Sequence, residues 1–193
     1  MSTDIAPNAD DQFFGQGMEY HTAGRFAAVA GFPKLTGNLF HHAVEMFIKA
    51  HLSKTVSLDD LKDKYGHKLT KLWGAFTAQF PREDLSIFNE FIQGLDRFEK
   101  IRYPDLILEK GASITVGWGP RDTFGASTDS FLTSFKLSVS EMDALVNRLF
   151  VVCSVNPHWY TMGLSTEARR ALEMFNASCK TWFPTNTSDE PTS

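Results

Sequence analysis

The spacing of apolar residues predicts that most of the chain is helical. One apolar stripe, in which such residues recur every three or four positions, runs between residues 35 and 52: Leu35, Leu39, Ala43, Met46, Phe47 and Ala50. Similar spacing, together with capping residues and Gly or Pro stops, predicts further helices over residues 11–30, 57–65, 67–80, 83–101, 138–155 and from 165 onward. These segments favour a mainly α fold, a helical bundle of four or more long helices.

The middle of the chain, from Leu106 to Val139, has strand character instead. Ile114, Val116 and Trp118 alternate with small or polar neighbours, and a second alternating run ends at Val139. Gly119-Pro120 is a turn signal between the two runs. We therefore predict a small antiparallel β-hairpin, inserted between the helices at about residues 106–139.

The ends of the chain differ from the rest. Residues 1–11 and 184–193 are rich in Ser, Thr, Asn, Asp and Pro, and contain too few apolar residues to order themselves. We predict two disordered tails around a single domain over residues 12–183, a length that one hydrophobic core can serve.

The charge, the cysteines and the hydrophobicity of the chain limit which functions are expected. The net charge is -4, and the chain contains no run of Lys or Arg, so any binding to nucleic acid would have to be local. The only cysteines, Cys153 and Cys179, lack CxxC spacing and are expected to be reduced and buried. With no signal-like N-terminus and no apolar stretch of membrane-spanning length, we expect a cytoplasmic protein with no membrane partner.

Three local patterns, in this order, carry a resemblance to a known family. The first is His42-Ala-Val-Glu45-Met-Phe-Ile-Lys49-Ala, the second is Tyr65-Gly-His67-Lys-Leu, and the third is Arg102-Tyr103-Pro104. Together they resemble the HEPN superfamily. The resemblance implies a helical bundle that often forms homodimers and has a polar site between helices. Many members are metal-independent ribonucleases, often toxins, and others bind nucleotides or RNA.

The chain departs from the ribonuclease pattern of that family. HEPN ribonucleases carry an Arg and a His separated by four to six residues, and no arginine of this chain has a His at that distance. The nearest approach is Arg148 to His158, which Asn156-Pro157 interrupts. Since cleavage of this type needs a base beside the attacking hydroxyl and a cation at the phosphate, the departure favours a noncatalytic protein.

The candidate ligand-binding residues are Glu45, Lys49, His67 and Arg102, with His41 and Tyr103 as additional candidates. If they converge, they form a mixed-charge pocket suited to phosphate or carboxylate. His41, Glu45 and Lys49 share one helix face, which is also typical of a solvated stripe with a structural ion pair. His42, nearer the apolar face, is expected to be packed.

A metal site was the weaker interpretation of the same residues. His41 and Glu45 at i, i+4 could supply two ligands and His67 a third, but no second pair at ligand spacing exists in the sequence. We therefore predict no metal and no cofactor.

The leading hypothesis is a noncatalytic HEPN-like module that binds a nucleotide, RNA or a partner protein, as a homodimer. One alternative is a divergent metal-independent ribonuclease or toxin that uses His41, His67 or His158 with an Arg from a facing helix. Another is a structural interaction protein whose polar residues only fix the register of the helices.

Overall fold

The computed structural model describes residues 8–103, 108–109, 111–124 and 132–183. Its longer helices are α1 (Ala9–Val29), α2 (Pro33–Leu52), α4 (Leu69–Thr77), α5 (Asn89–Phe98), α7 (Val139–Val152) and α9 (Thr166–Glu173). The short elements are α3 (Leu58–Asp60), a π-helical turn (Leu61–Tyr65), α8 (His158–Thr161), and 3₁₀ turns at Ser86–Phe88, Glu99–Ile101, Arg121–Thr123 and Ser178–Thr181. The strands are β1 (Ala112–Gly117) and β2 (Thr133–Ser138). The prediction of a mainly α bundle with a small β element is confirmed.

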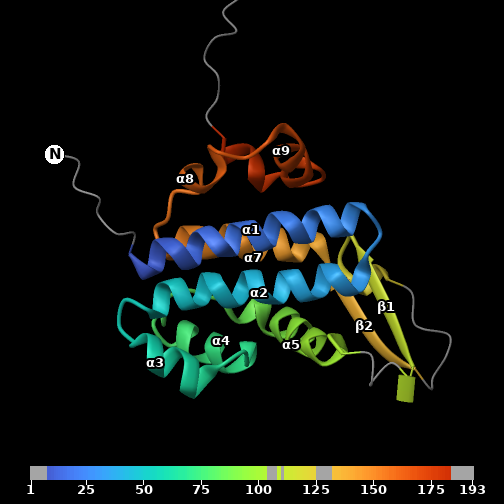
Figure 1. Cartoon of the computed structure of the whole chain (residues 1–193), viewed down its shortest axis with the longest axis horizontal. Helices are drawn as coiled ribbons and strands as arrows, with labels where there is room; N and C mark the ends of the chain where they lie inside the picture. The colour runs from blue at the N-terminus through green and yellow to red at the C-terminus, as the bar shows by residue number, and fades with distance from the viewer. Residues whose placement is uncertain (1–7, 104–107, 110, 125–131, 184–193) are drawn as a thin grey trace, which may run out of the picture.

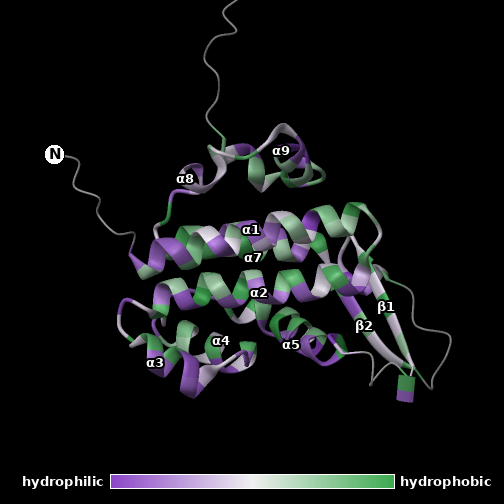
Figure 2. Ribbon diagram, viewed as in Figure 1, coloured by the Kyte–Doolittle hydropathy of each residue, from purple (hydrophilic) through white to green (hydrophobic). Residues whose placement is uncertain are grey.

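Helix α2 is the central element of the bundle. It packs along α1, and it also contacts α4, α5, α7 and β1. Figure 1 shows α1 and α2 side by side, with α3 to α5 on one side of α2, with α8 and α9 beyond α1, and with the two strands at one end. The buried surface of α2 differs from the single stripe that the sequence predicts, since Leu35 of that stripe is exposed while polar residues such as Glu45 are buried. Figure 2 shows the mixed polar and apolar character of these helices.

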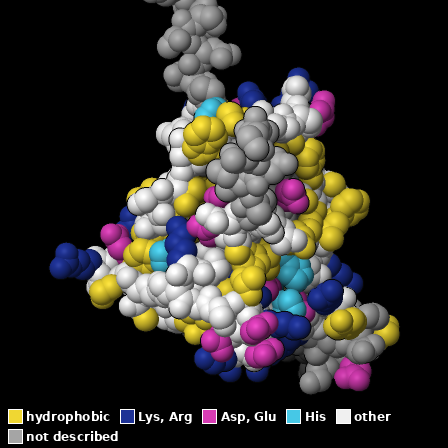
Figure 3. Space-filling model, turned by 60° about the vertical axis from the view of Figure 1, so that its left-hand side comes forward, with side chains coloured by type: hydrophobic (Ala, Val, Ile, Leu, Met, Phe, Trp, Pro, Cys, Tyr) yellow, Lys and Arg dark blue, Asp and Glu magenta, His cyan; other side chains and the backbone are white. Residues whose placement is uncertain are grey.

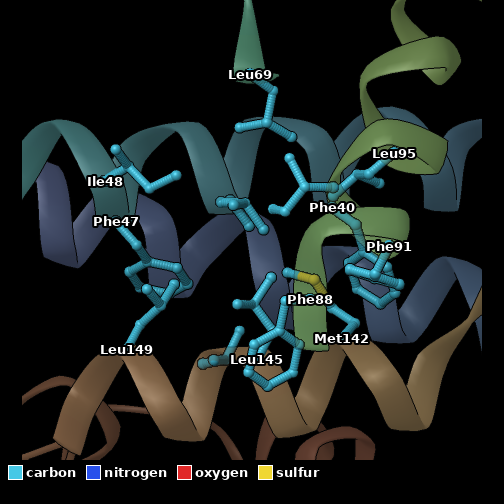
Figure 4. Close-up of a cluster of buried hydrophobic side chains, with 14 of the residues drawn as sticks. Phe40, Phe47, Ile48, Leu69, Phe88, Phe91, Leu95, Met142, Leu145 and Leu149 are labelled. Carbon is cyan, nitrogen blue, oxygen red and sulfur yellow. The ribbon is translucent and has the colours of Figure 1, made fainter. Parts of the chain in front are cut away.

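The core lies between α2 and the helices that cover it. Figure 4 shows Phe40, Phe47 and Ile48 of α2 facing side chains of α4, α5 and α7. The labelled side chains from those helices and the adjoining 3₁₀ turn, all buried, are Leu69, Phe88, Phe91, Leu95, Met142, Leu145 and Leu149. Burial of a side chain of this size contributes about 1.5–3 kcal/mol, so this interface supplies much of the driving force for folding.

Serine caps begin the helices where the sequence places them. The Ser138 hydroxyl accepts a hydrogen bond from the backbone N–H of Glu141 at 3.1 Å, as the predicted capping-box spacing requires. Ser165 caps α9 in the same way. At the start of α2, Gly31 adopts a φ of 74° and Pro33 occupies the first helical turn, which explains the break that the sequence predicts there.

Phenylalanine rings pack directly against Gly24 of α1 and Gly37 of α2. A Cβ atom added to Gly37 would overlap the ring of Phe98, and one added to Gly24 would overlap the ring of Phe40. By contrast, nothing lies within 4 Å of the corresponding position at Gly15. These glycines therefore set how closely the helices and their aromatic neighbours approach.

Replacing Gly37 with alanine is expected to lower the free energy of unfolding by about 1–3 kcal/mol, the usual cost of overpacking. This loss should appear although alanine is the better helix former by about 1 kcal/mol. Gly15→Ala is the matched control, because it gains propensity without a clash and should raise stability by about 0.5–1 kcal/mol. Chemical denaturation of both variants measures the difference. Equal stability of the two variants would contradict the packing account.

The β-hairpin prediction was wrong in its topology. β1 and β2 pair in parallel, with Ala112 opposite Thr133 and Gly117 opposite Ser138. The connection between the strands is too long for a tight hairpin turn, and a connection of a dozen or more residues lets the chain return and enter the second strand in the same direction. The alternation in β2 is as expected, because Phe135 and Leu137 are buried and Phe135 contacts Phe98 of α5.

The predicted N-terminal tail is too long, since α1 already begins at Ala9. Residues 1–7 and 184–193, where the rest of the tail predictions fall, lie outside the described residues. Cys153 and Cys179 are both free and buried, as predicted, and burial raises the pKa of each thiol to about 12. In the described ranges, no helix combines the length and the apolar character that a bilayer crossing requires.

Candidate functional site

Glu45 is a buried carboxylate at the centre of a cluster of polar side chains. It lies on α2, its side chain has no solvent exposure, and the ammonium of Lys49, one turn later, donates to its Oε1 atom at 2.6 Å. His41, Glu45 and Lys49 are all buried, so the interpretation of this face as a solvated stripe was wrong. The reason is that other parts of the chain cover the side of α2 that carries these residues, as the contacts of His41 with Leu95 and His67 show.

His67 reaches Glu45 from the segment that precedes α4. Its Nδ1 atom lies 3.0 Å from Oε1 and 3.1 Å from Oε2 of Glu45, while 64% of its side chain is exposed. The turn at Gly66, with a φ of 54°, brings the chain to this position. The backbone N–H of Leu69 then donates to Asp96 of α5 at 2.8 Å, which fixes the start of α4. The predicted convergence of Glu45, Lys49 and His67 is therefore present.

The two neighbouring histidines of α2 have the reverse of their expected roles. His41 is fully buried, and its two ring nitrogens lie 3.3 Å from the carbonyl oxygen of Leu95 and 3.2 Å from that of His67. His42, which we expected to be packed, has 20% of its side chain exposed, and its Nδ1 atom lies 3.5 Å from Oε2 of Glu45. His41 therefore ties His67 to α5, and His42 faces the carboxylate.

The charge state of Glu45 follows from its partners. Burial alone would raise its pKa, but hydrogen bonds from His42 and Lys49, the charge of Lys49 and the hydrogen bond from His67 outweigh burial and lower the pKa to about 2. Glu45 is thus an anion at neutral pH. Its Oε1 atom accepts from Lys49, His42 lies beside Oε2, and His67 lies beside both oxygens.

These atoms have the spacing of a metal-ligand set. The ligand atoms of His42, Glu45 and His67 all lie within 4.8 Å of one another. In a tetrahedral zinc site with bonds of about 2.0–2.1 Å, neighbouring ligand atoms are separated by about 3.3 Å. Figure 3 shows a face of the molecule on which histidine side chains lie side by side at the surface, among charged and hydrophobic neighbours. The sequence signal for this set is the i, i+3 spacing of His42 and Glu45.

Arg102 and Tyr103 do not join the cluster. Arg102 is exposed, its Nη1 atom lies 3.4 Å from Glu99, and its guanidinium lies 5.8 Å from the centroid of the Tyr103 ring. The predicted convergence of Arg102 with Glu45 was therefore wrong. Because Arg102 follows the 3₁₀ turn at Glu99–Ile101, its nearest carboxylate is local. The predicted pocket therefore lacks the guanidinium that would grip a phosphate.

A second buried cluster was missed by the sequence analysis. On α1, Arg25 donates to Asp143 of α7 and His21 lies 3.1 Å from the same carboxylate. Arg25 also donates to the carbonyl oxygens of Ala171 (2.7 Å) and Met174, at the end of α9. Burial lowers the pKa of His21, which keeps it neutral. His21 and Arg25 share one helix and have no solvent exposure, so this cluster does not provide the exposed His–Arg pair that a ribonuclease requires.

Comparisons with known proteins give no family or relative. No family model matches the chain, and no match was found among curated proteins or among solved structures. The HEPN resemblance therefore stays a prediction, as do the homodimer and the cytoplasmic location.

Proposed function

We propose that this protein is a helical module that binds a divalent transition-metal ion, with Zn²⁺ as the best fit, through His42, Glu45 and His67. The observation that carries the proposal is the position of two partly exposed imidazoles on one buried carboxylate. Two histidines and one carboxylate are a known zinc ligand set, in which a fourth position is left for water or another ligand. The exposure of His67 gives an ion in solution access to the cluster.

The residues around the set support the same function. Lys49 donates to Oε1 of Glu45, and this contact holds the carboxylate where His42 lies beside Oε2 and His67 beside both oxygens. His41 bonds the backbone carbonyl oxygen of His67 and so positions the segment that carries the third ligand. Contacts of this kind commonly orient metal ligands and raise their affinity.

A metal ion fits the cluster better than the nucleotide or RNA that the sequence suggested. Glu45 and Lys49 neutralise each other, and Arg102 pairs with Glu99 instead, so among the described residues no guanidinium contacts this group of side chains. A phosphate would therefore meet a buried carboxylate without the bidentate cation that usually offsets its charge. The proposal does not depend on membership of the HEPN superfamily, and the ribonuclease alternative has its own test in an assay of RNA cleavage with EDTA present.

Calorimetric titration of the full chain with Zn²⁺ is expected to show one ion bound per chain. His67→Ala and His42→Ala should each weaken binding by at least about tenfold, since each removes one of three protein ligands. Binding should also weaken on acidification, because only a deprotonated imidazole donates its electron pair to a metal.

His158→Ala is the matched control. It removes an imidazole from α8, outside the cluster, and should leave the affinity unchanged. If the full chain takes up no Zn²⁺, or if His158→Ala weakens binding as much as His67→Ala does, the proposal fails. The first of these results would favour the structural alternative, in which the cluster only holds α2 against the start of α4.

A further inference from the structure

A separate cleft lies between α5 and β2, on a part of the molecule that the metal ligands do not include. Its volume is about 630 Å³, and its basic lining residues come from three elements: Arg97 from α5, Arg121 from the 3₁₀ turn at Arg121–Thr123, and Lys136 from β2. From the orientation of these cations and the space between them, we propose that the cleft binds a phosphate group.

Aromatic rings hold two of the guanidiniums in place. Arg97 lies over Phe135 at 5.3 Å and Arg121 over Phe91 at 5.7 Å, each measured from the guanidinium carbon to the ring centroid. A guanidinium fixed in this way loses little freedom on binding, and its planar fork matches the oxygens of a phosphate. The two guanidiniums are therefore preorganised to bind an anion.

Each cation keeps hydrogen-bonding capacity for a ligand. Arg97 donates one hydrogen bond, to the carbonyl oxygen of Ser134, and Lys136 donates one, to that of Phe124. Arginine has five N–H donors and lysine has three. Within the part of the chain that the structure describes, most of these donors have no protein acceptor.

The acidic residues offset much of the charge of the cleft, since three basic and two acidic side chains line it and Glu141 adds a carboxylate beside Arg121. Arg121 pairs with Glu141 through Nε at 2.6 Å. Glu90 and Asp122 also line the cleft, but Glu90 is 90% exposed and lies 4.0 Å from Arg121, a distance at which water screens the pair. Lys136 and Arg97 face no carboxylate within 4.0 Å among the described residues. The lining therefore favours a doubly charged anion over a single carboxylate.

Gly94 leaves the cleft open on the α5 side. It is one of the lining residues, and a Cβ atom added there would lie 3.5 Å from Nη1 of Arg121, in ordinary contact. A leucine at this position would fill the space beside the guanidiniums while all three charges stay. It would also improve the helix propensity of α5, so the variant should fold.

The test is calorimetric titration of the full chain with inorganic phosphate, at constant ionic strength and with EDTA present so that the metal site plays no part. Phosphate is expected to bind, and Arg97→Ala should reduce its affinity by about tenfold or more, the effect of losing a charge-assisted hydrogen bond. Gly94→Leu should reduce the affinity by about as much, because it fills the space that the phosphate would occupy. Arg102→Ala, which removes an exposed arginine outside the cleft, should change the affinity by less than about twofold.

Acetate and adenosine 5′-phosphate complete the experiment. Acetate should bind at least about tenfold more weakly than phosphate, and tighter binding of adenosine 5′-phosphate would show that the ligand extends beyond its phosphate group. The proposal is overturned if phosphate does not bind, if acetate binds equally well, or if Arg102→Ala matches the loss in Arg97→Ala. It is also overturned if a folded Gly94→Leu variant, checked by thermal melting, keeps the affinity of the parent.

Discussion

Replacing Glu45 with glutamine is expected to lower the free energy of unfolding by about 3 kcal/mol at pH 7. The variant leaves the ammonium of Lys49 buried without its anion, and a lost partner of this kind typically costs about 3–5 kcal/mol. The pKa of Glu45, lowered to about 2, gives a similar figure, since each unit of difference from the unfolded chain corresponds to about 1.4 kcal/mol. Urea denaturation at several pH values measures the effect.

The pH dependence gives this prediction a definite sign. A carboxyl group whose pKa is lower in the folded state stabilises the fold above its unfolded value near 4.5, and this contribution is lost as the pH falls toward 2. The difference between the parent and Glu45→Gln should therefore be constant from pH 7 to about 5 and shrink below that range. Glu90→Gln, at a 90% exposed side chain, is the control and should stay within about 0.5 kcal/mol of the parent. If the stability difference between the parent and Glu45→Gln does not change with pH, the carboxylate is not stabilised as described.

Asp143→Ala is expected to be at least as destabilising, by about 3–5 kcal/mol. It removes the anion from Arg25, which has no solvent exposure, and the acceptor from His21. An unpaired guanidinium in the core carries the full cost of desolvation. Because Arg25 also bonds the last carbonyl groups of α9, amide hydrogen exchange in α9 should accelerate more than in α4.

A double variant separates the charge from the packing. Arg25→Met combined with Asp143→Leu removes both charges and keeps apolar volume, so it should lose less stability than the two single variants together. The expected coupling energy is about 2 kcal/mol or more. If the stability loss of the double variant equals the sum of the two single losses, the side chains act independently. That result would contradict the contact between Arg25 and Asp143.

Local patterns were enough to predict most of the helices. Their ends carry explicit signals, such as the serine at position 138 and the Gly31 and Pro33 break, and these signals act within a few residues of chain. The convergence of Glu45, Lys49 and His67 was predicted for a different reason. It rested on the order of motifs in a resembling family, and the geometry agrees with it although the comparisons identify no relative.

Properties that depend on distant neighbours could not be predicted. The amphipathic stripe of α2 is the signal of a helix with one buried face, and nothing local reveals that α4, α5 and α7 cover the others. The burial of Glu45 and His41 and the contact of His42 with the carboxylate depend on those distant neighbours. The relative direction of the strands could not be predicted for the same reason. Alternation identifies β1 and β2 but does not specify how the chain connects them.

In the proposed metal site, the buried carboxylate of Glu45 brings His42 and His67 together as ligands. X-ray absorption spectroscopy at the zinc edge, on the full chain loaded with one equivalent of Zn²⁺, tests it most directly. We predict a first shell of nitrogen and oxygen at about 2.0–2.1 Å with imidazole scattering, which His67→Ala should diminish. A shell of sulfur at about 2.3 Å, or a spectrum that His67→Ala leaves unchanged, would place the ion elsewhere and contradict the account.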